Sequence, residues 1–300
     1  MLDINAEILK LDWSREPKGL YEPIGYALAA GGKRLRPTLA LLGAQAVGGD
    51  DKAVLPAALA LEVFHNFTLL HDDVMDKASV RRGRPTVHVK WNENTAILSG
   101  DQMLIEAYKL LAQLPADKLP RVLDLFNKMA TEVCEGQQLD VDFETREDVT
   151  IAEYMEMIRL KTSVLLATAL QIGAYIAGGT HAEQQALYDY GINLGLAFQI
   201  QDDYLDCFGD PATFGKAIGG DIREGKKTWL WIVASQKSKV ESKNVSEVLK
   251  RYEESGVKQA AEEEITRLTQ KALDCLEVIK DSEAKAELVR LAEKLISRKS

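Results

Sequence analysis

The sequence contains two acidic stretches of the same pattern, LLHDDVMD at residues 69–76 and FQIQDDYLD at residues 198–206. Each stretch places three aspartates at positions i, i+1 and i+4 within an otherwise apolar segment. In an α-helix, positions i and i+4 lie on the same face, so the first and third aspartates of each triplet should point the same way. The apolar residues that precede both triplets indicate that these helices are largely buried.

Carboxylates on one helix face repel each other, and folding alone gives no reason to place them there. A divalent cation between them supplies a reason. Mg²⁺ is the best match, because this hard ion binds carboxylate oxygens, water and substrate phosphates. For a single motif, a solvated acidic face or a helix cap would be the simpler interpretation, but the apolar flanks and the second copy favour metal sites. The aspartates are Asp72, Asp73, Asp76, Asp202, Asp203 and Asp206.

Helical spacing of apolar residues extends through most of the chain. Leu55, Leu59 and Val63 recur every four residues, as do Leu104 and Tyr108. This period is typical of α-helices, whereas the alternation that marks β-strands is hard to find. Short segments rich in glycine and proline separate stretches of helical length. The sequence therefore predicts an all-α protein with about ten or more helices.

The length of 300 residues suits two average domains or one large domain built from long helices. No linker rich in Ser, Pro or Gly divides the chain, and no repeat at the period of a solenoid is found. The charged segment from Glu241 onward should form exposed amphipathic helices that close the bundle. We therefore expect a single domain over residues 1–300.

The chain carries 46 acidic and 37 basic residues and is 46% hydrophobic, with a net charge of −9. This composition excludes disordered, collagen-like and disulfide-rich classes. The acidic balance argues against general binding of nucleic acid or anionic membranes. The three cysteines, Cys134, Cys207 and Cys275, are far apart and odd in number, so they favour a reducing compartment over disulfides or zinc.

No segment reads as a signal peptide or a membrane span. The N-terminal residues carry scattered charges and lack the apolar stretch of a signal peptide. The longest uncharged stretch, Thr162–Ala182, contains polar and glycine residues, and its apolar part is shorter than the roughly 20 residues that span a bilayer. We expect a buried helix there, no integral membrane segment, and a cytoplasmic location.

Basic residues gather in two short segments, 31–36 and 77–90, which together carry a charge of +8 and no acidic residue. The first opens with a double glycine that allows a tight bend, and the second directly follows the first aspartate triplet. Arginine and lysine are the usual partners of phosphate oxygens. The alternatives are nucleic-acid contact and a solvated loop, but no aromatic residues interleave with the bases, which favours diphosphate. The bases are Lys33, Arg34, Arg36, Lys77, Arg81, Arg82, Arg84 and Lys90.

Further candidates lie near these motifs. Lys161 and Thr162 open the predicted buried helix of residues 162–177, where a cation, a hydroxyl and free backbone N–H groups could receive an anion. Lys216 and Lys226 follow the second aspartate triplet in glycine-rich loops that could close over phosphates. Alone, these residues would more commonly be a helix start and surface lysines.

His65 lies seven residues before Asp72, two helical turns back on nearly the same face. A lone histidine at such a position is usually a satisfied core residue. Beside a metal-binding aspartate, it could also donate a hydrogen bond to a second phosphate.

Taken together, these motifs resemble those of the trans-isoprenyl diphosphate synthases, which elongate prenyl chains. The family's regions stand here in order as GGKRLRP, HDDVMDKASVRRGRPTVH, EGQQLD, KT and FQIQDDYLDCFGDPATFGK, followed by EGKKT, and the match covers about two thirds of the chain. The resemblance implies a type I isoprenoid synthase bundle of helices around a central active-site cavity. It also implies a homodimer, with the two aspartate-rich helices facing each other across the cavity.

The resemblance assigns roles to individual residues. It implies that three Mg²⁺ ions are held by Asp72, Asp76 and Asp202. The implied catalytic residues are Asp72, Asp73, Asp76, Arg81, Lys161, Asp202, Asp203 and Lys216. The implied ligands of the allylic diphosphate are Arg81, Lys161, Thr162, Gln199, Lys216 and Lys226, and the choice between Lys226 and Lys227 is open. The implied ligands of isopentenyl diphosphate are Lys33, Arg36, His65 and Arg82.

Product length should depend on residues that precede the first aspartate triplet. Phe67 lies about 7.5 Å along the helix axis from Asp72, where it would form the floor under the growing chain, with Phe64 deeper and Thr68 beside it. In relatives that make long chains this place resembles a small residue, and in farnesyl diphosphate synthases two adjacent aromatics are common. The single aromatic, combined with DDxxD spacing, favours geranylgeranyl diphosphate (C20), then farnesyl diphosphate (C15), then longer products.

Other classes of protein remain possible on these motifs. A terpene cyclase or a head-to-head condensing synthase also pairs acidic helices with Mg²⁺, but neither needs the basic segments that would hold isopentenyl diphosphate. A non-catalytic partner subunit of a prenyl synthase would have degraded aspartate motifs, whereas both are intact here. A helical metal-binding module would bind Mg²⁺ or Ca²⁺ without turnover.

Overall fold

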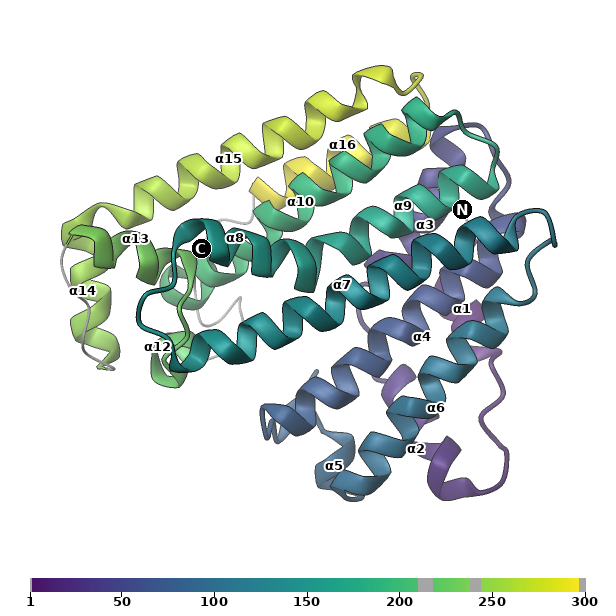
Figure 1. Cartoon of the computed structure of the whole chain (residues 1–300), viewed down its shortest axis with the longest axis horizontal. Helices are drawn as coiled ribbons and strands as arrows, with labels where there is room; N and C mark the ends of the chain where they lie inside the picture. The colour runs from purple at the N-terminus through teal and green to yellow at the C-terminus, as the bar shows by residue number, and fades with distance from the viewer. Residues whose placement is uncertain (1, 210–217, 238–243, 297–300) are drawn as a thin grey trace. The chain divides into compact units, whose positions relative to one another are not determined.

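The computed structural model describes residues 2–209, 218–237 and 244–296, and Figure 1 shows that these residues are mostly helical. The helices of the first half are α1 (Ile4–Leu9), α2 (Lys18–Leu28), α3 (Leu35–Ala46), α4 (Asp51–Met75), α5 (Val87–Lys90), α6 (Glu93–Leu111) and α7 (Leu119–Thr145). Those of the second half are α8 (Ile151–Ile158), a π-helical turn (Arg159–Ser163), α9 (Val164–Ile176), α10 (His181–Phe208), α12 (Gly220–Glu224), α13 (Trp229–Lys237), α14 (Val245–Ser255), α15 (Val257–Cys275), a 3₁₀ turn (Leu276–Val278) and α16 (Glu283–Ile296). The predicted all-α class and number of helices are confirmed.

One short hairpin interrupts the helices. Strand β1 (Val80–Arg81) pairs antiparallel with β2 (Arg84–Pro85). Between them, Arg82 and Gly83 have φ angles of 52° and 73°, as a tight two-residue hairpin turn requires. The hairpin was not predicted, because strands of two residues are too short to show a periodic pattern.

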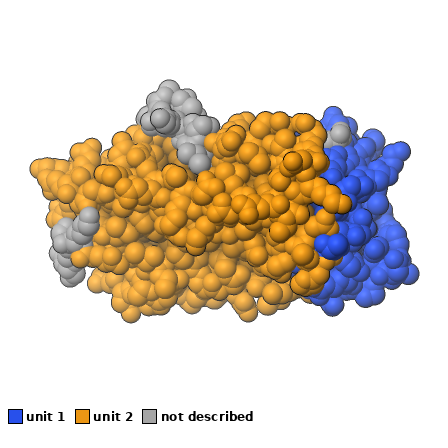
Figure 2. Space-filling view, turned by 90° about the horizontal axis from the view of Figure 1, so that it is seen from above, with its two compact units in different colours: residues 1–125, 169–180 blue, residues 126–168, 181–300 orange. Residues whose placement is uncertain are grey.

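Contacts divide the chain into two compact units, coloured in Figure 2. Unit 1 comprises residues 1–125 and 169–180. Its long helix α4 packs against α3 and α6 and is capped at its N-terminus by Asp50, whose carboxylate accepts a hydrogen bond from the Lys52 N–H at 3.2 Å. Helices α3 and α9 approach so closely at Gly173 that a Cβ added there would overlap the Ala40 carbonyl. Helix α4 itself contributes many buried apolar residues, among them Leu59, Leu61 and Val63, to the core of this unit.

Unit 2 comprises residues 126–168 and 181–300. Helix α10 packs against α15, which buries Val257, Ala261 and Ile265 on one face. The Tyr190 hydroxyl of α10 donates to the Leu288 carbonyl of α16 at 2.7 Å. The C-terminal helices are therefore amphipathic, as predicted. The single domain over residues 1–300 stays a prediction, since the two units describe only where contacts are dense.

Helix α4 is, among the described residues, the one helix long and apolar enough to cross a bilayer, with a mean hydropathy of 1.5 in its best window. Of that window, 61% is buried inside the protein. Core helices meet the same criterion of length and composition. The absence of an integral membrane segment stays a prediction. It was based on residues 162–182, the longest uncharged stretch, and not on α4.

Candidate active site

The first aspartate triplet lies at the C-terminal end of α4. The helix ends at Met75, and the N–H of Asp76 donates to the Asp72 carbonyl at 2.8 Å, so these two residues are one turn apart, as predicted. Asp72 is half-buried and Asp76 is exposed. The C-terminal end of a helix carries partial negative charge, which makes carboxylates unfavourable there. A cation would relieve both the dipole and the repulsion between the aspartates.

Asp73, the middle aspartate, has a protein partner. Its side chain is buried and accepts a hydrogen bond from Arg81 Nε at 2.7 Å. Burial raises the pKa of the Asp73 carboxyl, and the Arg81 guanidinium opposes that rise. This ion pair joins β1 to α4 and places the predicted diphosphate ligand Arg81 beside the first triplet.

The two basic segments meet in unit 1. The Arg82 guanidinium donates a hydrogen bond to the Gly31 carbonyl. It also packs against Gly32: a Cβ added to Gly32 would lie 2.9 Å from the Arg82 Cζ. Gly32 has φ +131°, a backbone conformation that favours glycine. Lys33 follows on the exposed side. The structure thus brings GGKRLRP and RRGRPT together, although 51 residues separate the bonded pair.

Arg36 and His65 complete this basic group. Arg36 Nε is buried and has no hydrogen-bond partner among the described residues. Burial lowers the pKa of Arg36 to about 10, with Glu62 opposing the shift and Arg82 adding to it. Burial, together with Arg36 and Arg82, holds the pKa of His65 well below its usual value. The site therefore combines charged arginines with a neutral imidazole, which still offers one N–H.

Glu62 is the buried counter-ion of this group. Its carboxylate accepts a hydrogen bond from Arg34 Nη1 at 2.7 Å and another from Asn66 Nδ2 at 3.0 Å. Arg34 and Glu62 are both buried, so this pair is largely shielded from water. Arg34 thus belongs to the framework of the basic group.

We expect His65 to make the protein sensitive to acid. Because its folded pKa is depressed, the unfolded chain takes up a proton below pH 6.5 while the folded protein does not. The free energy of unfolding should then fall by up to about 1.4 kcal/mol per pH unit from this group. Urea unfolding of wild type and His65→Gln at pH 7 and pH 5 measures the effect, with His181→Gln as the control for loss of an exposed histidine. Equal pH slopes for wild type and His65→Gln would contradict it.

The residues predicted to set product length lie along α4. Phe64 is buried and Phe67 is half-buried, with ring centroids 5.5 Å apart. Phe67 also contacts the ring of His71 at 4.8 Å, next to the first triplet. The Thr68 hydroxyl donates to the His65 carbonyl at 2.8 Å, so this hydroxyl is bonded to the backbone of its own helix. Phe67 is thus the aromatic between Phe64 and the aspartates, as its sequence position predicts.

The second triplet lies near the end of α10, and its members differ in surroundings. Asp202 is exposed, whereas Asp203 and Asp206 are buried. The Asp206 carboxylate accepts hydrogen bonds from the N–H groups of Gly220 and Asp221 at 3.2 and 3.1 Å. Asp206 therefore has protein partners of its own, because the chain returns at α12 and its amides engage this carboxylate, and its supporting role beside Asp202 stays a prediction.

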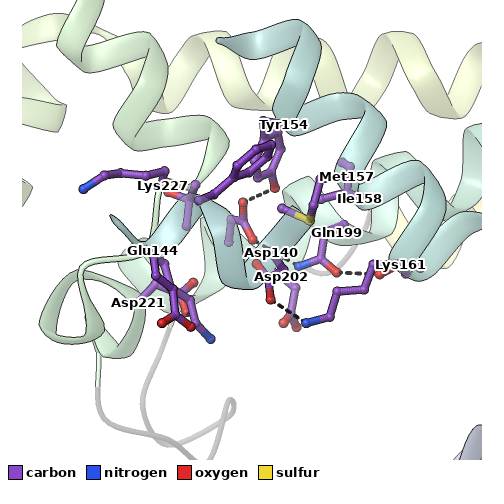
Figure 3. A pocket seen from close by; sticks show the side chains of 15 residues that line it. Asp140, Glu144, Tyr154, Met157, Ile158, Lys161, Gln199, Asp202, Asp221 and Lys227 are labelled. Carbon is purple, nitrogen blue, oxygen red and sulfur yellow. Dashed lines mark hydrogen bonds and ion pairs between the residues drawn. The ribbon is translucent and has the colours of Figure 1, made fainter. Parts of the chain in front are cut away.

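A pocket of about 200 Å³ lies in unit 2, and Figure 3 shows its side chains. Lys161 Nζ forms an ion pair with Asp140 at 2.5 Å, and Thr162 donates to Gln199 Oε1 at 3.2 Å. The predicted residues that line it are Lys161, Thr162, Gln199, Asp202, Asp203 and Lys226. Lys216, also predicted here, lies outside the described residues. Six residues predicted from separate motifs thus share one pocket.

The local structure at Lys161 and Thr162 corrects the prediction that a helix begins there. These residues do not open a helix, since α8, the π-helical turn of residues 159–163 and α9 run on without a break. No free helix N-terminus therefore exists there to bind an anion. Gly136 of α7 and Gly195 of α10 pack closely against the turn, and a Cβ on Gly195 would lie 2.6 Å from the Ser163 Cα. Such π turns are frequent at functional sites.

The pocket residues that were not predicted include Asp140, Tyr154 and Asp221. Burial and Asp206 raise the pKa of Asp221 to about 6, and burial with Asp221 raises that of Asp203 to about 8. Asp140 ends the EGQQLD motif and Asp221 follows a double glycine, so a signal existed for both. Tyr154 stands among apolar residues of an amphipathic helix and reads as a core residue.

The two adjacent lysines of EGKKT differ in orientation. Lys226 Nζ lies 3.0 Å from Glu224 and 3.9 Å from Asp221. Lys227 Nζ lies over the Trp231 ring, 4.5 Å from its centroid, and Figure 3 shows it directed away from Asp202 and Lys161. Of the two, Lys226 is the one placed among the carboxylates.

A model of the polyprenyl synthetase family matches residues 17–265. The chain belongs to the polyprenyl synthetase family. The geranylgeranyl diphosphate synthase of Methanosarcina mazei is 40% identical over 98% of this chain and 94% of its own. A geranylfarnesyl diphosphate synthase of Natronomonas pharaonis is 38% identical over 95% of this chain and 91% of its own. The crystal structure of a geranylgeranyl pyrophosphate synthase is 48% identical with a TM-score of 0.90, over 99% of this chain and 96% of that one.

Membership of the polyprenyl synthetase family confirms the predicted family and makes the protein a prenyltransferase of isoprenoid biosynthesis. It also agrees with the all-α fold, since the similar crystal structure covers nearly the whole chain. The central cavity implied by the resemblance, and the individual roles of the site residues, stay predictions.

Proposed function

We propose that this polyprenyl synthetase condenses isopentenyl diphosphate head to tail with an allylic diphosphate and releases geranylgeranyl diphosphate. The observation that carries this proposal is the pocket of unit 2, where Lys161, Thr162, Gln199 and Lys226 lie with Asp202. Donors and cations beside carboxylates suit an anion that arrives with a metal ion. A terpene cyclase shares this feature but gives no reason for the second basic group, formed by Arg36, His65 and Arg82.

The two groups would hold different diphosphates. Lys161, Thr162, Gln199 and Lys226, with Arg81 and Lys216, would bind the allylic diphosphate. Lys33, Arg36 and Arg82 would bind isopentenyl diphosphate, with His65 donating its one N–H. The unpartnered Arg36 Nε supports this assignment, because a buried donor without a partner costs stability unless a ligand satisfies it.

The carboxylates of the unit 2 pocket fit Mg²⁺. Asp202 shares the pocket with Asp140, Asp203 and Asp221, and burial, with a further contribution from neighbouring carboxylates, raises the pKa values of Asp203 and Asp221. Oxygen donors of this kind are the ones that Mg²⁺ prefers. Within the described ranges, no three His, Cys, Asp or Glu side chains form a ready metal cluster. We propose that Asp202, with Asp72 and Asp76, holds Mg²⁺, three ions in total.

Bound Mg²⁺ would supply positive charge to the departing diphosphate. Lys161 and Lys226 would add to that charge, and electrostatic stabilisation of this kind is usually the largest contribution to catalysis. The allylic C–O bond breaks and diphosphate leaves with the electron pair. The double bond of isopentenyl diphosphate forms the new C–C bond, and one proton passes to the released diphosphate. The protein thus needs no nucleophilic side chain.

The product length rests on Phe67. Overall similarity supports C20, since geranylgeranyl synthases at 40% and 39% identity are among the relatives, while a geranylfarnesyl synthase at 38% shows why a residue-level test is needed. We expect Phe67→Ala to lengthen the main product by at least one five-carbon unit, because it removes the aromatic ring between Phe64 and the aspartates. Chromatographic sizing of the products measures this. Phe64→Leu is the matched control and should leave the length unchanged while Phe67 remains, and a C20 product from Phe67→Ala would contradict Phe67 as the floor.

One assay tests the proposed function. The purified protein is incubated with Mg²⁺, isopentenyl diphosphate and, separately, the C5, C10 and C15 allylic diphosphates, and the products are sized. We expect chain extension that stops at C20. Extension that stops at C15 would indicate a farnesyl diphosphate synthase. No extension with any primer would exclude the proposal and favour a non-catalytic subunit or a metal-binding module.

We propose a cytoplasmic homodimer as the working form. The support is an exposed apolar row on α6, in which Leu98 is 60%, Ile105 53% and Tyr108 38% exposed. Exposed apolar patches commonly mark association surfaces. The free thiols of all three cysteines suit a reducing compartment. Light scattering of wild type and Ile105→Glu tests the dimer, and a monomeric wild type would exclude it.

A further inference from the structure

Tyr154 is a buried tyrosine whose hydroxyl points into the pocket of unit 2. Its side chain is 2% exposed, and it comes from the middle of α8. The hydroxyl donates to Asp203 Oδ2, a bond between residues 49 positions apart that Figure 3 shows as a dashed line from the tyrosine. The phenol therefore connects α8 to the second aspartate triplet on α10.

Asp203 has further partners, all weaker by geometry. Gln199 Nε2 donates to Oδ1 at 3.2 Å, and the Trp229 N–H lies 3.4 Å from Oδ2. The Tyr154 hydroxyl lies closer to its carboxyl oxygen than either nitrogen does, and a short O–H···O hydrogen bond is stronger than a long N–H···O one. Of these contacts, the one from Tyr154 should contribute most to fixing the carboxylate.

The contacts continue from Asp203 to the predicted diphosphate ligands. Gln199, which donates to Asp203, accepts a hydrogen bond from the Thr162 hydroxyl at 3.2 Å. This bond also orients the Gln199 amide, since its oxygen and nitrogen now have separate partners. One chain of hydrogen bonds thus runs from Tyr154 through Asp203 and Gln199 to Thr162. Asp202, the proposed metal ligand, is the residue next to Asp203.

We infer that Tyr154 is a positioning residue for the allylic diphosphate site. It holds Asp203, and through Asp203 it fixes Gln199, Thr162 and the end of α10 that carries Asp202. Tyr154 itself touches no substrate in this scheme. The inference rests on the proposed function only for the identity of the ligand, a metal-bound diphosphate.

The test is Tyr154→Phe, which keeps the ring and removes the hydroxyl. Calorimetric titration with inorganic diphosphate in the presence of Mg²⁺ should show affinity about tenfold weaker, the upper range for losing one ordinary hydrogen bond. The KM for the allylic diphosphate should rise similarly, while the KM for isopentenyl diphosphate stays within about twofold, because the chain of hydrogen bonds from Tyr154 includes none of its proposed ligands. This division between the two substrates is a readout that general loss of stability would not produce.

Tyr190→Phe is the matched control. Tyr190 is also a buried tyrosine, but its hydroxyl donates to the Leu288 carbonyl, away from the pocket residues. It should lower the melting temperature without changing the diphosphate titration. If Tyr154→Phe does the same, Tyr154 is merely structural and the inference is wrong.

A double-mutant cycle with Asp203→Asn tests the route. If Tyr154 acts through Asp203, its removal should have little further effect on diphosphate affinity in the Asp203→Asn background. An undiminished effect would overturn the inference. Because the titration uses inorganic diphosphate, it remains informative even when wild type fails to extend any primer, an outcome that would count against the proposed function alone.

Discussion

Replacing Asp202 by asparagine is expected to lower kcat/KM for condensation by about 1000-fold, the upper range for losing one electrostatic contribution to a transition state. Asparagine has nearly the same shape, so the change removes the negative charge and little else. Asp202 is the exposed member of the second triplet and lines the pocket with Lys161, so no other group there replaces its charge at the same position. The loss should fall on the step in which diphosphate departs.

Steady-state kinetics at saturating isopentenyl diphosphate measure this effect, with circular dichroism to verify the fold. Asp281→Asn is the matched control, because the Asp281 side chain is 99% exposed and pairs only with Lys285 among the contacts described. The control should keep full activity. A decrease of less than about tenfold for Asp202→Asn would remove the metal-binding role from this residue, since such a loss is no larger than that of one ordinary hydrogen bond.

Gly136→Ala should produce the second large effect, on both stability and substrate binding. A Cβ on Gly136 would overlap the main-chain nitrogen of Lys161 in the π-helical turn, and main chain cannot move aside as a flexible side chain can. We expect the free energy of unfolding to fall by about 3 kcal/mol, the upper range for overpacking a core. The turn should also shift, which displaces Lys161 from Asp140 and raises the KM for the allylic diphosphate.

Urea unfolding and the KM values of the two substrates measure this prediction. Gly19→Ala is the control: Gly19 lies in α2, a Cβ there meets nothing within 4 Å, and the change should stabilise the protein by about 0.5–1 kcal/mol. Equal rises in both KM values for Gly136→Ala would argue for general loosening, and an unchanged stability would show that α7 can move away from the turn.

The fold and much of the site could be predicted because they depend on periodic patterns and ordered motifs. Spacing of apolar residues identified the helices, and both aspartate triplets lie at helix ends within buried segments. The two basic segments were expected to act together only because both suit phosphate, and the structure brings them into contact through the hydrogen bond from Arg82 to the Gly31 carbonyl.

The site features that were not predicted depend on tertiary contacts, which produce no recognisable pattern in the local sequence. The π-helical turn at Lys161 and Thr162 has the composition of an ordinary helix, so the sequence suggested a helix start instead. Asp206 occupies the same position as Asp76 in its motif, but the amides of Gly220 and Asp221 engage it. Tyr154 gave no signal, because a tyrosine on an apolar helix face is usually part of the core.

The buried pair of Arg34 and Glu62 has a consequence for how this sequence can change over time. Loss of either partner alone leaves an unpaired buried charge, which costs about 3–5 kcal/mol, a large part of the roughly 5–15 kcal/mol by which proteins are ordinarily stable. Joint replacement of both by apolar residues of similar volume is often neutral. These two positions, 28 residues apart, should therefore coevolve: a change at one is expected to be retained together with a change at the other.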